Sequence, residues 1–414
     1  MFAKRKRPGA LRLLGLTTLA VSALSATLVV GGGVLTAVMA RAVVTPPKRQ
    51  DDDIRVLAYD PDAGIVTLQA TPDSLLTGTY GFWFSGDSGH ARLGRILSHE
   101  GDTVTRVVET VDFGDLSRAA AGRWSGWVYL GPWALGVPYE NVLIPSPGGP
   151  APAWLIPAEG GSAGENWVIQ VHGRGVRRQE TLRAVTAFRE AGFASLLVSY
   201  RNDGDAPASA DGKYGLGDTE WQDVEAALEF ARDRGARRVV LMGWSMGGAI
   251  VLQTLTRARH RELIAGIVLD SPAVDWADVV AYQGRLVRLP SVIAQGAMTV
   301  MGHRWGRAVT GQAAPISFAR LNIVAQAADL DVPILLMHSD DDGYVPATGS
   351  RALAAARPDI VTFVPFTEAR HTKLWNHDPK PWNAAITSWL ARLESLTATD
   401  ASQRLETSSA VPGN

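Results

Sequence analysis

The sequence predicts an α/β fold: a mostly parallel β-sheet with helices on both faces, preceded by a transmembrane helix and a small all-β domain. Three observations lead to this prediction. Over most of the chain, apolar runs rich in β-branched residues alternate with amphipathic helical segments. Before them lies a stretch of short alternating runs without helical periodicity. A long apolar segment without charges comes first.

The composition excludes several classes of function. The chain has 414 residues, of which 46% are hydrophobic and 20% are charged, and its net charge is −1. A near-neutral charge gives no electrostatic case for binding nucleic acid. The absence of cysteine excludes disulfides, thiolate catalysis and cysteine metal sites. Neither an HExxH motif nor a dinucleotide fingerprint occurs, so we expect no metal and no cofactor.

Residues 1–50 predict a cytoplasmic basic stub, a transmembrane anchor and a linker. Leu13–Ala40 contains no charged residue and exceeds the ~20 residues that a spanning helix needs. Positive charge is concentrated before it, at Lys4–Arg7 and Arg12, which predicts a cytoplasmic N-terminus. We therefore expect a single-pass protein of the cell membrane with an extracytoplasmic main domain. Val38–Ala40 also resembles a cleavage site, so removal of this segment remains an alternative.

Residues 51–136 predict a small β-rich domain. Short alternating runs such as IRVLAYD, GIVTLQA and DTVTRVVETVD are separated by Gly, Asp and Pro. The sequence identifies no partner for this domain. Its aromatic residues are expected to form the domain core rather than a ligand surface: Tyr80, Phe82, Trp83, Phe84, Trp124, Trp127 and Tyr129.

Residues 137–397 predict the larger α/β domain. YENVLIP and PAWLIPA flank the turn SPGGPA and predict an antiparallel hairpin. An interval of about 273–330 is too long for a simple crossover, so we expect a helical cap insertion over the C-terminal ends of the strands. A final helix near 382–396 should pack on the sheet, and the polar tail 398–414 is expected to be disordered. The six expected strands are 167–172, 194–200, 238–242, 264–270, 332–338 and 360–366.

The stretch RRVVLMGWSMGGAIVLQ contains the pattern Gly-x-Ser-x-Gly around Ser245. A strand is expected to end just before this pattern and a helix to begin near Met246, which is the strand–turn–helix setting of a nucleophile elbow. Gly243 and Gly247 leave room where the strand and the helix approach closely. In a chain with 42 glycines the pattern alone arises easily by chance. Its position at the junction is what favours Ser245 as a nucleophile.

A serine nucleophile needs a base, and the base needs an acid to orient it. The strand VPILLMH is followed by SDDDGYVP, in which Asp340, Asp341 and Asp342 compete for the role of the acid. After the next strand comes TEARHTKLWN with His371. Both segments follow the C-terminal ends of parallel strands, where sites on such sheets collect. We therefore expect a triad of Ser245, His371 and one of the three acids.

The segments GWSMGG, HSDDDGYVP and EARHTKLWN together resemble the α/β-hydrolases of the serine esterase and prolyl-oligopeptidase-like type, over roughly Val137–Leu396. In the family pattern H-G-x-x-D-x-x-V-P the acid lies four residues after the histidine, which corresponds to Asp342 here, while Ser339 replaces the usual glycine. The resemblance implies an α/β-hydrolase fold with Ser245, Asp342 and His371 as the triad. The order of anchor, β-domain and main domain resembles that of membrane-tethered bacterial α/β-hydrolases.

An oxyanion hole needs two N–H donors, and the first is expected from the backbone of Met246. In the loop VHGRGVRRQE, His172-Gly173 resembles the His-Gly motif of the family, which implies the N–H of Arg174 as the second donor. His172 is expected to order this loop through hydrogen bonds. The Arg174 side chain either contacts an acidic group of the substrate or pairs with a nearby acid. Asp270, at a strand end, either supports packing or tunes the catalytic histidine.

These residues predict acyl transfer through an acyl-enzyme intermediate on a small-molecule ester or peptide-like substrate. A carboxylesterase is the simplest hypothesis. A serine peptidase or amidase and an acyltransferase would use the same residues and remain alternatives. A hypothesis of another class is a non-catalytic binding protein that retains the fold, and the complete triad argues against it.

Overall fold

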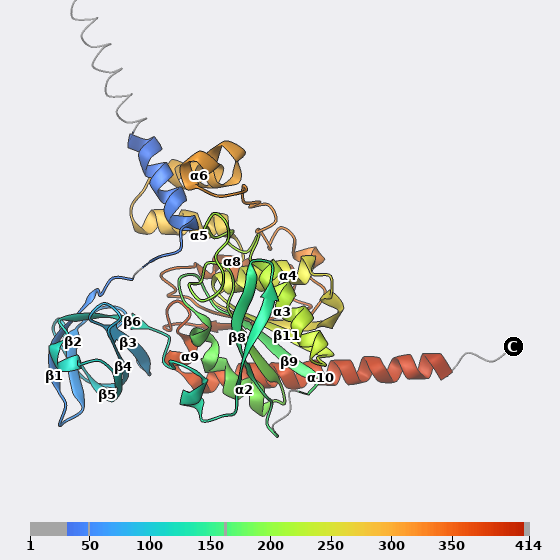
Figure 1. The fold of residues 1–414 in the computed structure, drawn as a ribbon, viewed down its shortest axis with the longest axis horizontal. Helices are drawn as coiled ribbons and strands as arrows, with labels where there is room; N and C mark the ends of the chain where they lie inside the picture. The colour runs from blue at the N-terminus through green and yellow to red at the C-terminus, as the bar shows by residue number, and fades with distance from the viewer. Residues whose placement is uncertain (1–30, 49, 161–163, 410–414) are drawn as a thin grey trace, which may run out of the picture.

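The computed structural model describes residues 31–48, 50–160 and 164–409, which form a β-barrel, a larger α/β domain and a helical cap (Figure 1). Most of the apolar segment Leu13–Ala40 lies outside the described residues. Its last part belongs to a helix over residues 31–44. Within the described ranges, no helix combines the length and the apolar character needed to cross a membrane.

The predicted all-β domain is a closed six-stranded barrel with the strand order β1-β2-β5-β4-β3-β6. Alternating apolar residues point inward and form a core of their own. Five of the seven aromatic residues predicted for this core are buried, whereas Trp127 and Tyr129 follow the last strand and are only partly buried. The strands are β1 (Ile54–Asp60), β2 (Ile65–Gln69), β3 (Tyr80–Phe84), β4 (Gly89–Glu100), β5 (Thr103–Phe113) and β6 (Ala121–Ser125).

A buried arginine of β5 holds the connection between β2 and β3 against the barrel. Arg106 is fully buried, and its guanidinium donates hydrogen bonds to the carbonyl oxygens of Ser74, Leu76 and Gly78 at 2.6–2.9 Å. The guanidinium also lies 4.9 Å from the ring centre of Trp124, in a cation–π contact. Burial lowers the pKa of Arg106 to about 10, so this side chain remains charged at neutral pH. Arg106 therefore fixes the connection between β2 and β3, which has no strand partner of its own.

The α/β domain is built on an eight-stranded sheet with the order β14-β13-β12-β11-β9-β10-β8-β7. The six strands from β14 to β10 are parallel, and the predicted hairpin β7–β8 adds two antiparallel strands at one edge. The strands are β7 (Glu140–Ser146), β8 (Gly149–Ile156), β9 (Asn166–Val171), β10 (Ala194–Val198), β11 (Arg238–Trp244), β12 (Ile264–Asp270), β13 (Ile334–Ser339) and β14 (Val361–Phe366).

Helices cover both faces of this sheet, as the continuous apolar strands predict. On one face lie α3 (Trp221–Asp233), α4 (Met246–Arg257) and α8 (Ala347–Ala356), and on the other α2 (Val185–Glu190) and α10 (Pro379–Ser409). The tail 398–414 was expected to be disordered; α10 continues through it as far as Ser409, and residues 410–414 lie outside the described residues. Residues 398–409 contain neither proline nor glycine, so nothing in the backbone ends α10 where its buried part ends.

The cap insertion is helical, as predicted, and consists mainly of α5 (Trp276–Leu286), α6 (Ser291–Gly302) and α7 (Arg307–Thr310). The helix of residues 31–44 packs against α5 and α6 at the top of the molecule (Figure 1). Gly296 of α6 permits this contact, because a β-carbon there would lie 2.9 Å from Thr36 Cγ2. Ala40 and Val44 at the end of the helix are completely buried in the core of the α/β domain.

The barrel contacts the α/β domain at the short helix α9 (Leu374–His377). The side-chain amide of Asn376 donates to the carbonyl oxygens of Thr79 and Gly126, and the carbonyl oxygen of Asn376 accepts from the N–H of Thr79. Gly78 is needed here, because a β-carbon on it would lie 1.9 Å from the Asn376 oxygen. The barrel is therefore fastened directly to the segment that follows His371.

Replacing Arg106 with methionine is expected to destabilise the barrel by about 3 kcal/mol, because several buried carbonyl groups lose their hydrogen-bond donor. Urea unfolding followed by tryptophan fluorescence measures the change. Arg95→Met is the matched control, since Arg95 lies exposed on β4. Equal unfolding midpoints for the two variants would contradict the role assigned to Arg106.

Candidate active site

Ser245 occupies a strained turn between β11 and α4. Its backbone has φ 51° and ψ −116°, a conformation that residues with a side chain rarely adopt. The turn is held by the N–H of Ser245, which donates to the carbonyl oxygen of Asp270 at 3.0 Å. Gly247 is required, because a β-carbon there would lie 2.2 Å from the carbonyl oxygen of Val171. The turn lifts the hydroxyl of Ser245 clear of the sheet, at the start of a helix.

Three side chains predicted to act together form one hydrogen-bonded chain. His371 Nε2 lies 2.9 Å from Ser245 Oγ, and His371 Nδ1 lies 2.7 Å from Asp342 Oδ2. The structure places Asp342 against the imidazole, and not Asp340 or Asp341. The serine comes from the end of β11, the acid from the loop after β13, and the histidine from the loop after β14.

The carboxylate of Asp342 is buried and fully hydrogen-bonded. Burial by itself would raise its pKa, but the electrostatic interaction with His371 and the hydrogen bonds from His338 and His371 outweigh burial and hold the pKa well below its usual value. Its second oxygen accepts from the backbone N–H groups of Tyr344 and Val345 at 2.7 and 2.8 Å. A permanently ionised carboxylate in this position keeps the His371 proton on Nδ1 and leaves Nε2 free to accept the serine proton.

The neighbouring residues of the acid loop have structural roles. Asp341 Oδ1 accepts from the N–H of Arg370 and from Ser339 Oγ, and Ser339 Oγ in turn accepts from the N–H of Ala369. Ser339, which replaces the family's usual glycine, therefore helps to hold the loop that carries His371. Asp340 points outward and pairs with an exposed arginine.

A buried arginine supports the histidine loop from the opposite side. Arg183 donates to the carbonyl oxygen of Thr372 at 2.7 Å, to the side-chain oxygen of Asn376 and to the carbonyl oxygen of Glu180. The residues on both sides of His371 have positive φ, 58° at Arg370 and 51° at Thr372. These neighbours stabilise a strained loop, and the strain points the imidazole toward Ser245.

Asp270 does not contact His371. Its carboxylate is completely buried, where burial raises its pKa, and it accepts from Trp382 Nε1 and from Ser271 Oγ. Ser271 Oγ accepts from the N–H of Thr372 at 3.2 Å. Of the two roles considered for Asp270, the structure favours packing support, transmitted to the histidine loop through Ser271.

The expected oxyanion donors lie beside Ser245. Met246 is the first residue of α4, so its N–H has no partner within the helix. The N–H of Arg174 donates to no acceptor in the described part of the chain. Gly173 is close to the serine, since a β-carbon on it would lie 3.3 Å from Ser245 Cβ. Arg174 thus lines the same pocket as Ser245, and the N–H of Met246 directly follows Ser245 at the start of α4.

His172 and a buried glutamate order the loop that carries Arg174. His172 Nε2 lies 3.2 Å from Asp203 Oδ2, and its Nδ1 lies 2.9 Å from the carbonyl oxygen of Gly173. Glu180 Oε2 accepts from the N–H of Gly173 at 3.0 Å. His172 has the ordering role expected from the sequence. Glu180 was not singled out, because in the sequence it looks like a surface residue of an amphipathic helix.

The Arg174 side chain has neither of the two roles expected from the sequence, which were contact with an acidic substrate group and pairing with a nearby acid. It donates to the carbonyl oxygens of Ala42, Val43 and Thr45 at 2.7–3.1 Å, and thereby caps the C-terminal end of the helix of residues 31–44. The carbonyl oxygen of Val44 accepts from the N–H of Tyr214 at 2.8 Å. Arg174 therefore ties the N-terminal segment to the loop of the oxyanion donor.

The segment that follows this helix lines the pocket of the triad. The pocket has a volume of about 290 Å³, and Pro47 and Gln50 lie on its wall together with Ser245 and His371. The ring of Tyr344, 5.2 Å from the ring of His371, covers the imidazole. A larger cleft of about 630 Å³ adjoins the pocket between the barrel and the α/β domain. In the sequence, residues 45–50 look like a plain linker. The part that residues 45–48 and 50 play in lining the pocket and the cleft is visible only in the structure.

Two family models and a number of solved structures are similar to this chain. Residues 142–385 match the alpha/beta hydrolase family, and residues 55–125 match a domain family of unknown function, DUF8805. No functionally curated protein is similar enough in sequence to match the chain. The solved structure of an esterase from Pyrococcus furiosus is 18% identical, and the match covers 64% of this chain and 96% of that chain with a TM-score of 0.50. Est1E from Butyrivibrio proteoclasticus with bound ferulic acid is 16% identical, with 61% and 99% covered and a TM-score of 0.47.

Asp342→Asn is expected to lower kcat for an ester by about 10²–10⁴-fold, because the imidazole loses the charge that orients it. Asp340→Asn is the matched control and should change kcat by less than about twofold, since Asp340 only forms an exposed ion pair. Steady-state kinetics with p-nitrophenyl acetate measures both. The reverse order of effects would show that the acid has been assigned incorrectly.

Arg174→Met is expected to release the segment after the helix, because three backbone carbonyl groups lose their donor. Trypsin should then cleave after Arg41 at least about tenfold faster, since a loosened segment is a better protease substrate. Mass spectrometry of timed digests measures the rate. Arg177→Met, on the rim of the neighbouring cleft, serves as the control. An unchanged rate in Arg174→Met would refute the fastening role.

Proposed function

The chain belongs to the alpha/beta hydrolase family, and from this premise we propose that it is a membrane-anchored serine hydrolase that cleaves carboxylic esters. The observation that carries the proposal is the aligned chain of Ser245 Oγ, the His371 imidazole and the Asp342 carboxylate, with contacts of 2.9 and 2.7 Å. This is the arrangement that converts a serine hydroxyl into a nucleophile.

The reaction runs in two steps. His371 Nε2 takes the proton of Ser245 as Oγ attacks the ester carbonyl carbon, and the N–H groups of Met246 and Arg174 stabilise the oxyanion. The imidazolium then donates its proton to the leaving alkoxide, and the acyl group stays on Ser245. His371 next activates a water molecule, which attacks the acyl-enzyme and releases the carboxylic acid. Asp342 remains ionised and orients the imidazole throughout.

Esters are the simplest substrates for this site. An alcohol leaves the tetrahedral intermediate more readily than an amine, so an ester places the smaller demand on the proton donor. The pocket around Ser245 is small, about 290 Å³, which suits a compact acyl group. A second candidate is peptide or amide cleavage. It is favoured by the cleft of about 630 Å³ that the barrel residues Trp83 and Trp127 help to form beside this pocket, where an extended substrate could lie.

Membrane anchoring belongs to the same proposal. It is supported by the uncharged run Leu13–Ala40 and by the cluster of positive residues before it. In this orientation the barrel and the α/β domain lie outside the cytoplasm. The anchor would join the pocket wall without a flexible spacer, because the helix of residues 31–44 ends at the carbonyl groups held by Arg174.

A substrate panel on cell fractions tests the function. Membrane fractions from cells that express the full chain should hydrolyse p-nitrophenyl esters, and Ser245→Ala should lower the rate by at least about 10⁴-fold. Aminoacyl p-nitroanilides, tested in parallel, separate an esterase from a peptidase. Activity confined to the soluble fraction would contradict the anchor. Ester hydrolysis that survives in a folded Ser245→Ala protein would contradict the mechanism.

A further inference from the structure

An exposed apolar surface lies on the helical cap and on the helix of residues 31–44 beside it. Six large apolar side chains on it are 46–66% exposed, and they come from two places in the sequence that pack together: Val34, Leu35, Val38, Leu286, Val287 and Val292. The contacts of Gly284 with Met39 and of Gly296 with Thr36 hold the two parts side by side. We call these six residues the cap patch. The surfaces of soluble proteins seldom expose so many aliphatic side chains close together, and such a patch is typical of a binding surface.

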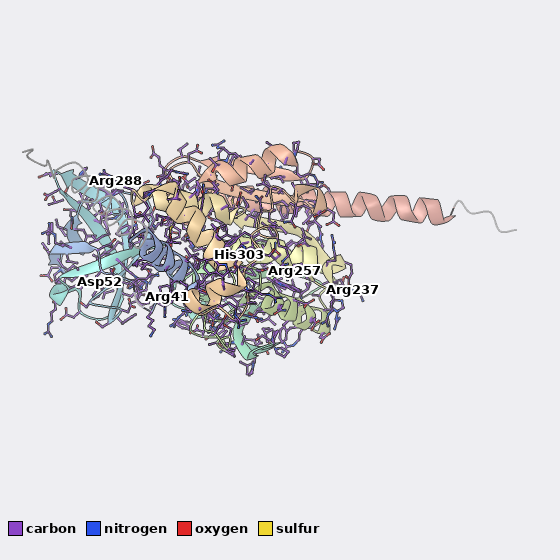
Figure 2. All side chains as sticks on the ribbon, turned by 90° about the horizontal axis from the view of Figure 1, so that it is seen from above. Arg41, Asp52, Arg237, Arg257, Arg288 and His303 are labelled. Atoms are coloured by element: carbon purple, nitrogen blue, oxygen red, sulfur yellow. The ribbon has the colours of Figure 1, made fainter. Side chains whose placement is uncertain are left out.

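Two arginines adjoin the cap patch, and a third follows the other end of α6. Arg285 and Arg288 lie between its residues at the tip of the α5–α6 hairpin, and Arg304 follows α6, next to the exposed Trp305. In the described part of the chain, none of these three arginines forms an ion pair with a carboxylate. Figure 2 looks down on this side of the molecule and labels Arg41, Arg288 and His303 on it. Aliphatic residues next to unpaired arginines, with an arginine and an exposed tryptophan at the other end of α6, match the boundary between lipid tails and anionic headgroups.

The position of the cap patch along the chain points to the same partner. The helix that contributes Val34, Leu35 and Val38 continues the uncharged run that begins at Leu13. A helix that spans ~30 Å of hydrocarbon needs only about 20 of these 28 residues, so the remainder must leave the bilayer at the level of the headgroups. The described helix, and α6 beside it, are therefore carried to the lipid surface by the anchor itself.

The cap patch is also close to the triad. Tyr282 of α5 donates from its hydroxyl to the carbonyl oxygen of Asp342 at 3.0 Å, and Gln283 donates to that of Tyr344 at 2.6 Å. Tyr344 stacks on the imidazole of His371. Leu286, the first residue of the patch on α5, lies less than one helical turn beyond Gln283. A cap resting on lipid would therefore hold the triad near the headgroup layer.

We propose that the cap patch docks on an anionic lipid bilayer, so that Ser245 receives acyl esters of amphiphiles at the headgroup level of the membrane. The inference rests on the membrane-anchored hydrolase proposed above and names the surface and the class of substrate for the same site. The aliphatic side chains enter the tail region, and Arg285, Arg288 and Arg304 contact lipid phosphates. A second copy of the chain, or residues 1–30, would be other ways to cover the patch, and the experiment separates them from lipid.

The chain contains no cysteine, which allows a single-probe experiment on the full-length protein. Val292→Cys, labelled with the environment-sensitive fluorophore NBD, is reconstituted in vesicles of phosphatidylcholine and phosphatidylglycerol. Leu143→Cys is the matched control, because Leu143 is 62% exposed and Val292 is 65% exposed, and Leu143 lies on the edge strand β7. Replacing part of the lipid with nitroxide-labelled lipid should quench the Val292 probe at least threefold more strongly than the Leu143 probe.

Each other outcome overturns the docking. A Val292 probe that is as exposed to water as the control means that the cap patch faces solvent. A Val292 probe that is shielded from water but insensitive to nitroxide lipid means that protein covers the patch. A chain that fails to float with the vesicles overturns both the anchor and the docking. The measurement requires no catalysis, so failure of the docking and failure of the hydrolase function are distinguishable.

A second variant tests the consequence for the substrate. Val287→Glu combined with Val292→Glu should leave the hydrolysis of water-soluble p-nitrophenyl acetate within about twofold, because both residues are exposed and lie outside the pocket. Hydrolysis of an ester of a short acyl group with a long-chain alcohol, embedded in the same vesicles, should fall at least tenfold. Equal effects on the two esters would show that docking does not deliver the substrate.

Discussion

The structure of the site depends on the strained turn at Ser245. A residue with a side chain is held at positive φ, between a central parallel strand and the start of a helix. Gly243 and Gly247 are required because the turn brings the two elements into backbone contact. Close packing of α4 against the sheet stabilises this strained turn. As a result, the hydroxyl of Ser245 projects toward the ends of β13 and β14, after which Asp342 and His371 lie.

The loop that carries His371 is strained, and several neighbouring residues stabilise it. Ser339 and Asp341 bind the loop from the acid side, Arg183 binds it from beneath, and the barrel contacts it through Asn376. The barrel thus helps to support the loop of His371, besides forming one wall of the adjoining cleft. The N-terminal segment is tied by Arg174 to a different loop, the one that carries the expected second oxyanion donor. Parts of the chain that look separable in the sequence meet at the triad.

Strong local patterns allowed much of this to be predicted. Continuous apolar strands, a glycine-flanked serine and the order of the acid and the histidine led to the parallel sheet and to the three side chains that the structure brings together. Contacts between distant segments could not be predicted in this way. Glu180 and Arg183 look like surface residues of an amphipathic helix, and residues 45–50 look like a linker, because nothing local distinguishes them. The helical tail to Ser409 was missed because its polar composition outweighed its fair helix propensity.

We propose that Ser245 is a nucleophile activated by His371 and Asp342. The most direct test of this proposal is to treat the protein with a fluorophosphonate, which forms a stable covalent bond with an activated serine, and to map the adduct by mass spectrometry. We expect one adduct per chain, on the peptide that contains Ser245, and a rate of modification that falls sharply in Asp342→Asn. A folded protein that carries no adduct, or carries it on another residue, would contradict the account.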